Sequence, residues 1–264
     1  MVKEIYNEDC EVTLQRLQDN SIDVVLTSPP YNINSDTFDN DSNVYDEFID
    51  NMTKEEYIAW ILRLFTAFDR VLKPNGVVIW NAGYGNNVGA NGAGVLWEYI
   101  AEIIHNTPFT VADKIIWKKN SAIPINTTNK LTRICEDIFI FSRKSEIRSF
   151  HINKKHLYKS KHGNNISAII HNFIAAPNND ESCPLNKATY SSTLCEKLLS
   201  IYAPINEDTV VYDPFMGTGT TAVACTSLGI GYVGSELSSE QCKWAENRLK
   251  GVKGTVAIAK NVLF

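Results

Sequence analysis

The chain has 264 residues, of which 44% are hydrophobic and 21% are charged, and its formal net charge is −5. This composition is ordinary for a soluble globular protein, and no run approaches the roughly 18 apolar residues of a membrane span. The acidic net charge argues against a protein that coats nucleic acid over its whole surface, but it is compatible with a local basic face.

The six cysteines are scattered and include no CxxC pair, so the sequence indicates neither a disulfide framework nor a zinc site. The first residues include early acidic side chains and no apolar stretch, which argues against a signal peptide. We therefore expect a cytoplasmic protein with reduced thiols, no metal and no membrane association.

Predicted helices and strands alternate in the first half of the chain. The apolar periodicity predicts a helix over 11–17, a strand over 22–26, a helix from 53 to 72, a strand over 77–80 and a helix over 95–105. Thr53 followed by Glu56 is a capping-box signature, and the segment 73–76 predicts a turn that ends the helix. A hairpin is expected to pair 114–118 with 137–142. This alternation predicts a doubly wound α/β sheet.

The hexapeptide Thr27-Ser28-Pro29-Pro30-Tyr31-Asn32 follows the strand over 22–26. Two consecutive prolines fix the backbone and remove two N–H donors, which leaves neighbouring carbonyls available as acceptors. A tyrosine beside this corner offers a flat face for stacking. The hexapeptide could hold a planar amino group such as that of a nucleobase, and an ordinary proline turn is an equally weighted reading. The long polar stretch over 34–51 predicts a mobile loop over a site, with a disordered surface loop as the alternative.

A basic segment begins at Arg143, and in it only Glu146 opposes the positive charges up to His162. Aromatic and histidine side chains are interleaved with these charges, as in surfaces that contact phosphates, although a solvated charged face is the common explanation for such a run. The predicted nucleic-acid-binding residues of this segment are Lys144, Arg148, Lys154, Lys155, Lys159 and Lys161.

A glycine-rich segment near the C-terminus, from Asp213 to Thr221, lies between a predicted strand over 210–212 and a helix over 222–228. A glycine-rich turn in this position brings a ligand close to backbone amides at a helix N-terminus. Glu236 is expected at the end of the next strand, where a carboxylate can accept hydrogen bonds from both ribose hydroxyls. The segment lacks the lysine of a phosphate-binding loop and has Ala222 in place of a third glycine, so a nucleoside without phosphates fits better than ATP or NAD.

The two motifs, in this order and with a basic insert between them, resemble the β class of S-adenosylmethionine-dependent DNA amino-methyltransferases. The resemblance implies a permuted Rossmann-like methyltransferase fold. Its parts would be a catalytic half over 1–142, a target-recognition insert over 143–182 and a cofactor-binding half over 183–264.

The resemblance also implies roles for individual residues. Segment 7–10 is similar to a family segment placed against the adenine of the cofactor, and 186–191 is similar to a segment that closes over its methionine. The implied catalytic residues are Ser28, Pro29, Pro30 and Tyr31. The implied cofactor-binding residues are Asp9, Cys10, Thr189, Tyr190, Asp213, Pro214, Phe215, Gly217, Gly219, Thr220, Thr221 and Glu236.

The implied reaction moves a methyl group from S-adenosylmethionine to the exocyclic amino group of a base that is flipped out of double-stranded DNA. In the family, serine at the position of Ser28 usually accompanies cytosine N4, and adenine N6 is the alternative. RNA and protein amino-methyltransferases usually carry asparagine there and place the cofactor loop first, and a non-enzymatic binding module is disfavoured by the intact motifs. The resemblance leaves a homodimer and a cognate restriction endonuclease open as partners.

Overall fold

The computed structural model describes residues 1–32, 52–82, 94–122, 124–126, 128, 131–154, 156–163, 165–180, 183, 186 and 189–252. The predicted loop over 34–51 and Lys155 therefore lie outside the described residues. In the described part of the chain, no helix is both long enough and apolar enough to cross a membrane.

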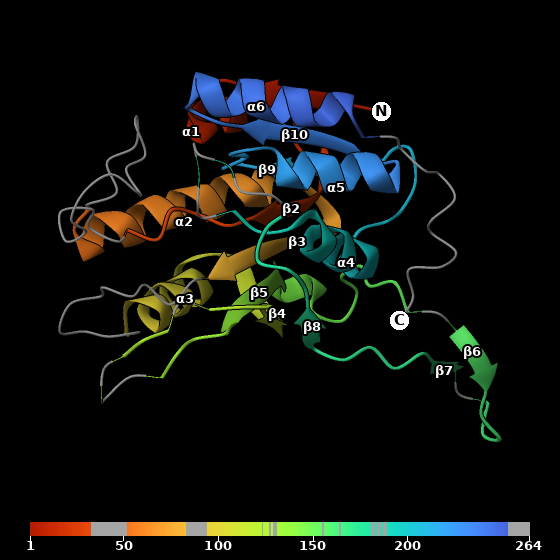
Figure 1. The fold of residues 1–264 in the computed structure, drawn as a ribbon. Coiled ribbons are helices and arrows are strands. Elements are labelled where there is room, and N and C mark those ends of the chain that lie inside the picture. The colour runs from red at the N-terminus through yellow and green to blue at the C-terminus, as the bar shows by residue number, and fades with distance from the viewer. Residues whose placement is uncertain are drawn as a thin grey trace.

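A mostly parallel sheet forms the centre of the molecule (Figure 1). Its strands are β1 (Lys3–Tyr6), β2 (Ile22–Thr27), β3 (Leu72–Ala82), β4 (Phe109–Lys118), β5 (Cys135–Arg143), β8 (Phe173–Ala175), β9 (Val210–Asp213) and β10 (Gly231–Ser235). They lie in the order β1-β10-β9-β2-β3-β5-β4-β8. The first five strands of this order are parallel, β5 is antiparallel to both of its neighbours, and β8 is parallel to β4.

Helices cover both faces of the sheet, as expected for a doubly wound fold (Figure 1). They are α1 (Cys10–Arg16), α2 (Lys54–Val71), α3 (Gly94–Asn106), α4 (Ser192–Tyr202), α5 (Thr220–Leu228) and α6 (Ser239–Lys250). Successive residues of β2 point to opposite faces, so Val24 packs in the cluster that includes α4 and α5, and Val25 packs in the cluster that includes α2 and α3. Two apolar layers thus enclose the parallel strands, and the predicted fold class is confirmed.

The expected capping box at the start of α2 is present. The Thr53 side chain accepts a hydrogen bond from the Glu56 amide, and the Glu56 carboxylate accepts one from the Thr53 amide at 2.9 Å. The end of α2 differs from the prediction, because β3 begins directly at Leu72. The expected turn over 73–76 lies inside the span of β3 as a bulge: the pairing with β2 steps from Leu72 to Val77.

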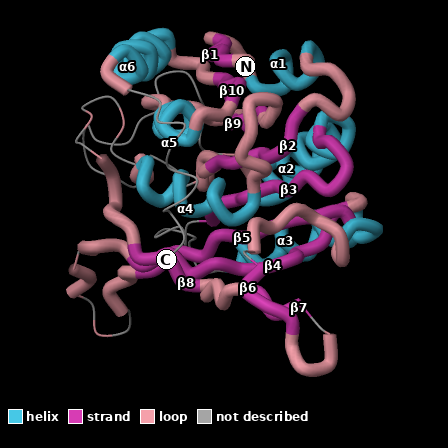
Figure 2. Tube along the Cα trace, turned by 90° about the vertical axis from the view of Figure 1, so that its right-hand side faces the viewer, coloured by secondary structure: helices cyan, strands magenta, loops and turns pink. Residues whose placement is uncertain are grey.

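The predicted hairpin of β4 and β5 is confirmed and is longer than expected. The insert follows it and begins with a short 3-10 helix, Lys144–Glu146. Its strands β6 (His156–Lys159) and β7 (Asn165–Ser167) pair with each other in a separate two-stranded sheet. This small sheet extends away from the main sheet in two perpendicular views (Figure 1 and Figure 2).

Candidate functional site

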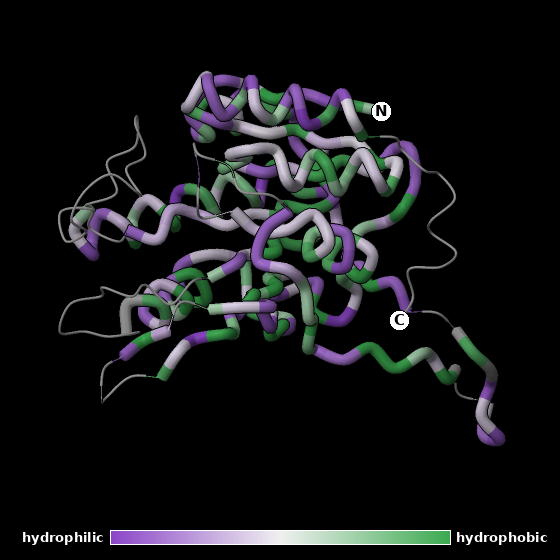
Figure 3. Tube along the Cα trace, in the orientation of Figure 1, coloured by the Kyte–Doolittle hydropathy of each residue, from purple (hydrophilic) through white to green (hydrophobic). Residues whose placement is uncertain are grey.

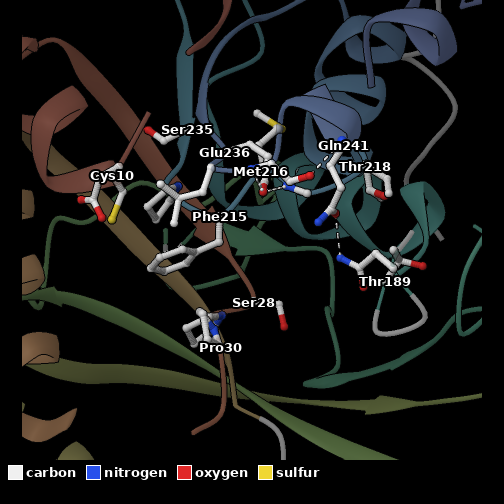
Figure 4. A pocket seen from close by; sticks show the side chains of 18 of the residues that line it. Cys10, Ser28, Pro30, Thr189, Phe215, Met216, Thr218, Ser235, Glu236 and Gln241 are labelled. Atoms are coloured by element: carbon white, nitrogen blue, oxygen red, sulfur yellow. Dashed lines mark hydrogen bonds between the residues drawn. The ribbon is translucent and has the colours of Figure 1, made fainter. Parts of the chain in front are cut away.

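A pocket lies at the carboxyl edge of the parallel strands, the edge where α/β sheets usually bind ligands. Four chain segments that leave this edge contribute to it: Asp9 and Cys10 after β1, Ser28 to Tyr31 after β2, Pro214 to Gly217 after β9, and Glu236 after β10. Figure 4 shows Ser28 and Pro30 on one side of the pocket and Glu236, Met216 and Gln241 on the other. The topology thus joins the two motifs that the sequence separates.

The proline turn is fixed against α2. The Tyr57 hydroxyl donates a 2.7 Å hydrogen bond to the Pro30 carbonyl, and the Tyr57 side chain is buried. Asn32, at the end of the turn, adopts a positive φ of 53°. Within the turn, the Ser28 and Tyr31 hydroxyl oxygens are 2.8 Å apart. The turn therefore presents a prearranged set of hydroxyls and carbonyls to the pocket.

The glycine-rich loop needs its glycines for different reasons. Gly219 has a φ of 83°, and a Cβ there would lie 2.6 Å from the Ala245 Cβ, so only glycine lets α6 pack against the start of α5. Gly217 also has a positive φ, 52°, and its amide points to Glu236. The loop leads directly to the N-terminus of α5 at Thr220. The first amides of a helix have no partner within the helix, and together with the helix dipole they attract polar ligand atoms.

The Glu236 carboxylate holds the pocket wall together. One of its oxygens accepts from the Gly217 amide at 2.8 Å, and the other accepts from the Ser238 amide at 2.9 Å. A carboxylate oxygen has more than one acceptor site, so each can also accept from a ligand hydroxyl. This is the position in which the sequence predicts a ribose-binding carboxylate.

Three predicted cofactor residues, Asp213, Gly219 and Thr221, lie behind the pocket wall, since they are not among the residues that line it. Asp213 is 1% exposed, and its carboxylate accepts hydrogen bonds from Thr27, Thr221, Tyr190 and the Phe215 amide. Burial raises the pKa of Asp213, and these four hydrogen bonds oppose the rise. These residues shape the loop, so their expected influence on a ligand is indirect.

The remaining predicted cofactor residues line the pocket: Asp9, Cys10, Thr189, Tyr190, Pro214, Phe215, Gly217, Thr220 and Glu236. Asp9 also caps α1, since its side chain accepts from the Glu11 amide at 2.7 Å. Burial raises the pKa of the Cys10 thiol and that of the Tyr190 hydroxyl, so both groups stay protonated at neutral pH.

Glu8, Asn186, Met216 and Thr218 also line the pocket and belong to the predicted segments 7–10, 186–191 and 213–221, although they were not named individually. The lining residues outside every predicted segment are Trp60, Ser235, Leu237, Ser238 and Gln241. Trp60 comes from α2, and its ring packs against Phe215 with centroids 5.4 Å apart. Asn186 donates to Gln241 at 3.1 Å across the pocket rim. No local pattern marks Trp60, because it looks like any other core position of an amphipathic helix.

The basic insert leaves the domain at the amino edge of the sheet, opposite the pocket. The Arg143 guanidinium, at the end of β5, donates to the carbonyls of Leu72 and Lys73 at the start of β3. Lys144 donates to the Thr107 carbonyl just before β4. The predicted DNA-binding residues Arg148, Lys154, Lys159 and Lys161 are exposed, and the tip of the β6–β7 hairpin is hydrophilic (Figure 3). The structure does not bring these side chains close to the pocket.

Metal ligands do not gather in the parts of the chain that the structure describes: no group of three His, Cys, Asp or Glu side chains there could hold an ion. The polar groups that converge on the pocket are hydroxyls, amides and carboxylates. Such a donor set suits a polar organic ligand.

The chain is similar to known DNA methylases. The family model N6_N4_Mtase, described as DNA methylase, matches residues 22–247. The chain is 29% identical over 269 residues to the type II methyltransferase M.BglII of Bacillus subtilis, and the match covers 95% of this chain and 69% of the relative.

Two solved structures share the fold. The PvuII DNA methyltransferase (cytosine-N4-specific) has a TM-score of 0.70 and 17% identity, with 94% of this chain and 86% of that chain covered. The M1.HpyAVI–SAM complex has a TM-score of 0.59 and 23% identity, with 94% and 100% covered.

Proposed function

The chain belongs to the DNA methylase family whose model spans its residues 22–247, and on this premise we propose that it transfers a methyl group from S-adenosylmethionine to the exocyclic amino group of a DNA base, with cytosine N4 as the favoured acceptor. The observation that carries the proposal is the meeting of the two motifs in one pocket: Ser28 to Tyr31 and Pro214 to Gly217 line the same cavity. An acceptor and a donor of a methyl group could therefore be held side by side.

The cofactor half would bind S-adenosylmethionine by its three parts. Glu236 would accept hydrogen bonds from the ribose hydroxyls. Asp9, Cys10 and Phe215 would contact the adenine, and Thr189 and Tyr190 would lie against the methionine. The bound cofactor supplies an electrophilic sulfonium methyl group.

The acceptor half would activate a poor nucleophile. The lone pair of an exocyclic amine is delocalised into the base. If the Ser28 hydroxyl or carbonyl and the Pro29 carbonyl accept its two N–H hydrogens, the nitrogen is favoured in a more tetrahedral form with its lone pair directed at the methyl group. Holding both reactants in this geometry supplies a large part of the rate enhancement. No covalent intermediate with the protein is needed.

The target base would be flipped out of the duplex, because the pocket cannot reach an amino group inside the stack. Tyr31 is the stacking partner that we propose for the extruded base. Its hydroxyl lies 2.8 Å from Ser28, which orients the ring before the base arrives.

The partner in this proposal is double-stranded DNA, and the proposed location is the cytoplasm of a prokaryotic cell. Phosphate contacts by the basic insert would lie far from the flipped base, because the insert leaves the sheet at the opposite edge. We keep a homodimer and a cognate restriction endonuclease as proposed partners. Light scattering of the purified protein tests the first, and co-purification tests the second.

The decisive experiment uses labelled cofactor and duplex DNA, followed by digestion to nucleosides. We expect label in N4-methylcytosine. Label in N6-methyladenine would overturn the preferred base but keep the enzyme class, and the absence of label from DNA would overturn the proposed function.

Ser28→Ala should lower the rate of methyl transfer while the affinity for S-adenosylmethionine stays unchanged.

A further inference from the structure

Three polar side chains form a hydrogen-bonded row behind the proline turn, which we call the acceptor turn from here on. They are Asn81 on β3, Glu136 on β5 and Lys119, which directly follows β4. The Asn81 amide nitrogen lies 3.0 Å from a Glu136 carboxylate oxygen, 3.1 Å from the Tyr31 hydroxyl and 3.3 Å from the Ser28 hydroxyl. Lys119 donates to the other Glu136 oxygen. Asn81 is only 5% exposed, so this row of side chains reaches the acceptor turn from inside the protein.

The orientation of the Asn81 amide follows from its neighbours. The Glu136 carboxylate pairs with the Lys119 ammonium, and a carboxylate only accepts hydrogen bonds. The amide nitrogen, and not the amide oxygen, must therefore face Glu136. This nitrogen has two hydrogens. With one directed to Glu136, the other is left for the two hydroxyl oxygens of Ser28 and Tyr31.

The orientation leaves one group unsatisfied. The Asn81 side-chain oxygen is buried and has no hydrogen-bond partner within the described residues. Buried polar atoms in native proteins almost always find partners, so an exception calls for an explanation. The contacts of the Asn81 side chain with the turn are therefore made by its amide nitrogen alone within the described residues.

We propose that Asn81 is a positioning residue of the methyl transfer, held by Glu136 and Lys119, and that its N–H fixes the Ser28 and Tyr31 hydroxyls in the rotation that receives the base; this proposal rests on the proposed function. An N–H shared by both oxygens limits the rotations open to the two hydroxyls, which also bond to each other. Ser28 is thereby oriented before the amino group arrives, so less ordering is left for the reaction step.

Asn81→Asp tests the direction of this hydrogen bond through pH. The new carboxylate would lie against Glu136, and two adjacent carboxylates hold a shared proton well above the ordinary aspartate pKa. When it is protonated, the introduced carboxyl group has one hydrogen in place of the two of the amide, and it can donate this hydrogen either to Glu136 or to the hydroxyls of Ser28 and Tyr31; when it is ionised, it has none to donate. We expect the kcat of this variant to be about 100-fold below wild type at about pH 8 and to recover in part as the pH falls towards about 5.5. Asn81→Leu should show the loss without the recovery.

The double variant Asn81→Asp/Glu136→Gln keeps the proposal testable if the single variant fails to fold. The amide introduced at position 136 can donate to the carboxylate introduced at position 81 and still accept from Lys119, so the buried pairing is restored with its direction reversed. We expect a folded protein with wild-type affinity for S-adenosylmethionine and with a kcat about 100-fold low at every pH. A kcat equal to wild type in this variant, or in Asn81→Asp at high pH, would overturn the proposal.

Asp137→Asn is the matched control. Asp137 is the next residue of β5, is buried, and pairs with Lys114 at 2.9 Å. Successive strand residues point to opposite faces, so this change should leave kcat and its pH profile unaltered. The activity of the wild-type enzyme distinguishes a failure of this proposal from a failure of the proposed function. If wild type methylates DNA and the Asn81 variants are fully active, only the positioning role of Asn81 is wrong. If wild type does not methylate DNA, the proposed function is wrong.

Discussion

The Thr27 hydroxyl donates a 2.7 Å hydrogen bond to the buried carboxylate of Asp213. Thr27 directly precedes the acceptor turn, and Asp213 directly precedes the cofactor loop. The two residues lie 186 positions apart in sequence, and both are fully or almost fully buried. This bond sets the relative position of the two halves of the site at their shared base, independently of any ligand.

Removing this bond should weaken both folding and catalysis. Thr27→Val keeps the shape of the side chain and deletes the hydroxyl, and we expect unfolding to become easier by about 2 kcal/mol, the usual value for a buried hydrogen bond to a charged group. Urea denaturation gives this number, and kcat should fall beyond the loss in folded fraction. Thr27→Ser, which keeps the hydroxyl, is the control. A Val variant as stable as the Ser variant would show that the bond contributes nothing.

The buried Asp213 carboxyl predicts a pH dependence. Burial raises its pKa above the ordinary 3.8, so the folded protein holds this proton to a higher pH than the unfolded chain does. The stability that the carboxyl contributes is complete below the ordinary pKa and declines as the pH rises through the folded-state pKa. Asp213→Asn removes this decline.

The measurement is urea denaturation of wild type and Asp213→Asn at several pH values. The stability advantage of wild type should be largest near about pH 4 and should shrink towards about pH 8. An advantage that grows with pH would mean that the hydrogen bonds from Thr27, Thr221, Tyr190 and the Phe215 amide outweigh burial, and that the pKa is lowered.

Glu236 offers a direct test of the cofactor pocket. Glu236→Gln removes a negative charge that should accept ribose hydroxyls, and we expect the affinity for S-adenosylmethionine to fall by about 2 kcal/mol, or about 30-fold. Calorimetry with the cofactor measures this change. Glu240→Gln, an exposed position in the first turn of α6, should bind as wild type does. Equal affinities for the two variants would place the ribose elsewhere.

Replacing basic residues of the insert should change the salt dependence of DNA binding. If Lys159 and Lys161 contact phosphates, then replacing both with glutamate should weaken DNA binding at all sequences and should reduce the slope of log affinity against log salt by about 1 per lost contact. Fluorescence anisotropy over a salt series measures the slope. Lys243→Glu/Lys250→Glu makes the same change in net charge on α6. Identical slopes for the two double variants would assign the DNA contacts to another surface.

The turn formed by Ser28 to Tyr31 could be predicted from sequence, because consecutive prolines act through local geometry, and its role in holding a base stays a prediction. The capping box of α2 and the strand–loop–helix at Asp213 were also predictable, since their signals span few residues. Asn81 and Glu136 were not, because Asn81 contacts the turn and Glu136 contacts Asn81 from strands that only the folded sheet brings together. The direct ligand contact expected of Asp213 is replaced by a role beneath the loop.

The position of the basic insert relative to the pocket could not be predicted from the sequence either. The hairpin of β4 and β5 was expected, but the edge at which β5 ends depends on its being antiparallel to β3. An antiparallel partner returns the chain to the amino edge, so the segment after Arg143 starts away from the pocket. Charge and composition alone identify a basic surface, and strand direction decides where it lies.

The route of the insert has a consequence for how such a protein can change over time. The chain leaves the main sheet at Arg143 and rejoins it at Phe173, the start of its outermost strand β8. Between these points, β6 and β7 form a two-stranded sheet that is separate from the main sheet in the described part of the chain. Segments attached in this way tolerate insertion and replacement, because the register of the sheet does not depend on them. Selection could therefore exchange the exposed hairpin for another one while the residues that bind the methyl donor and the base keep their places.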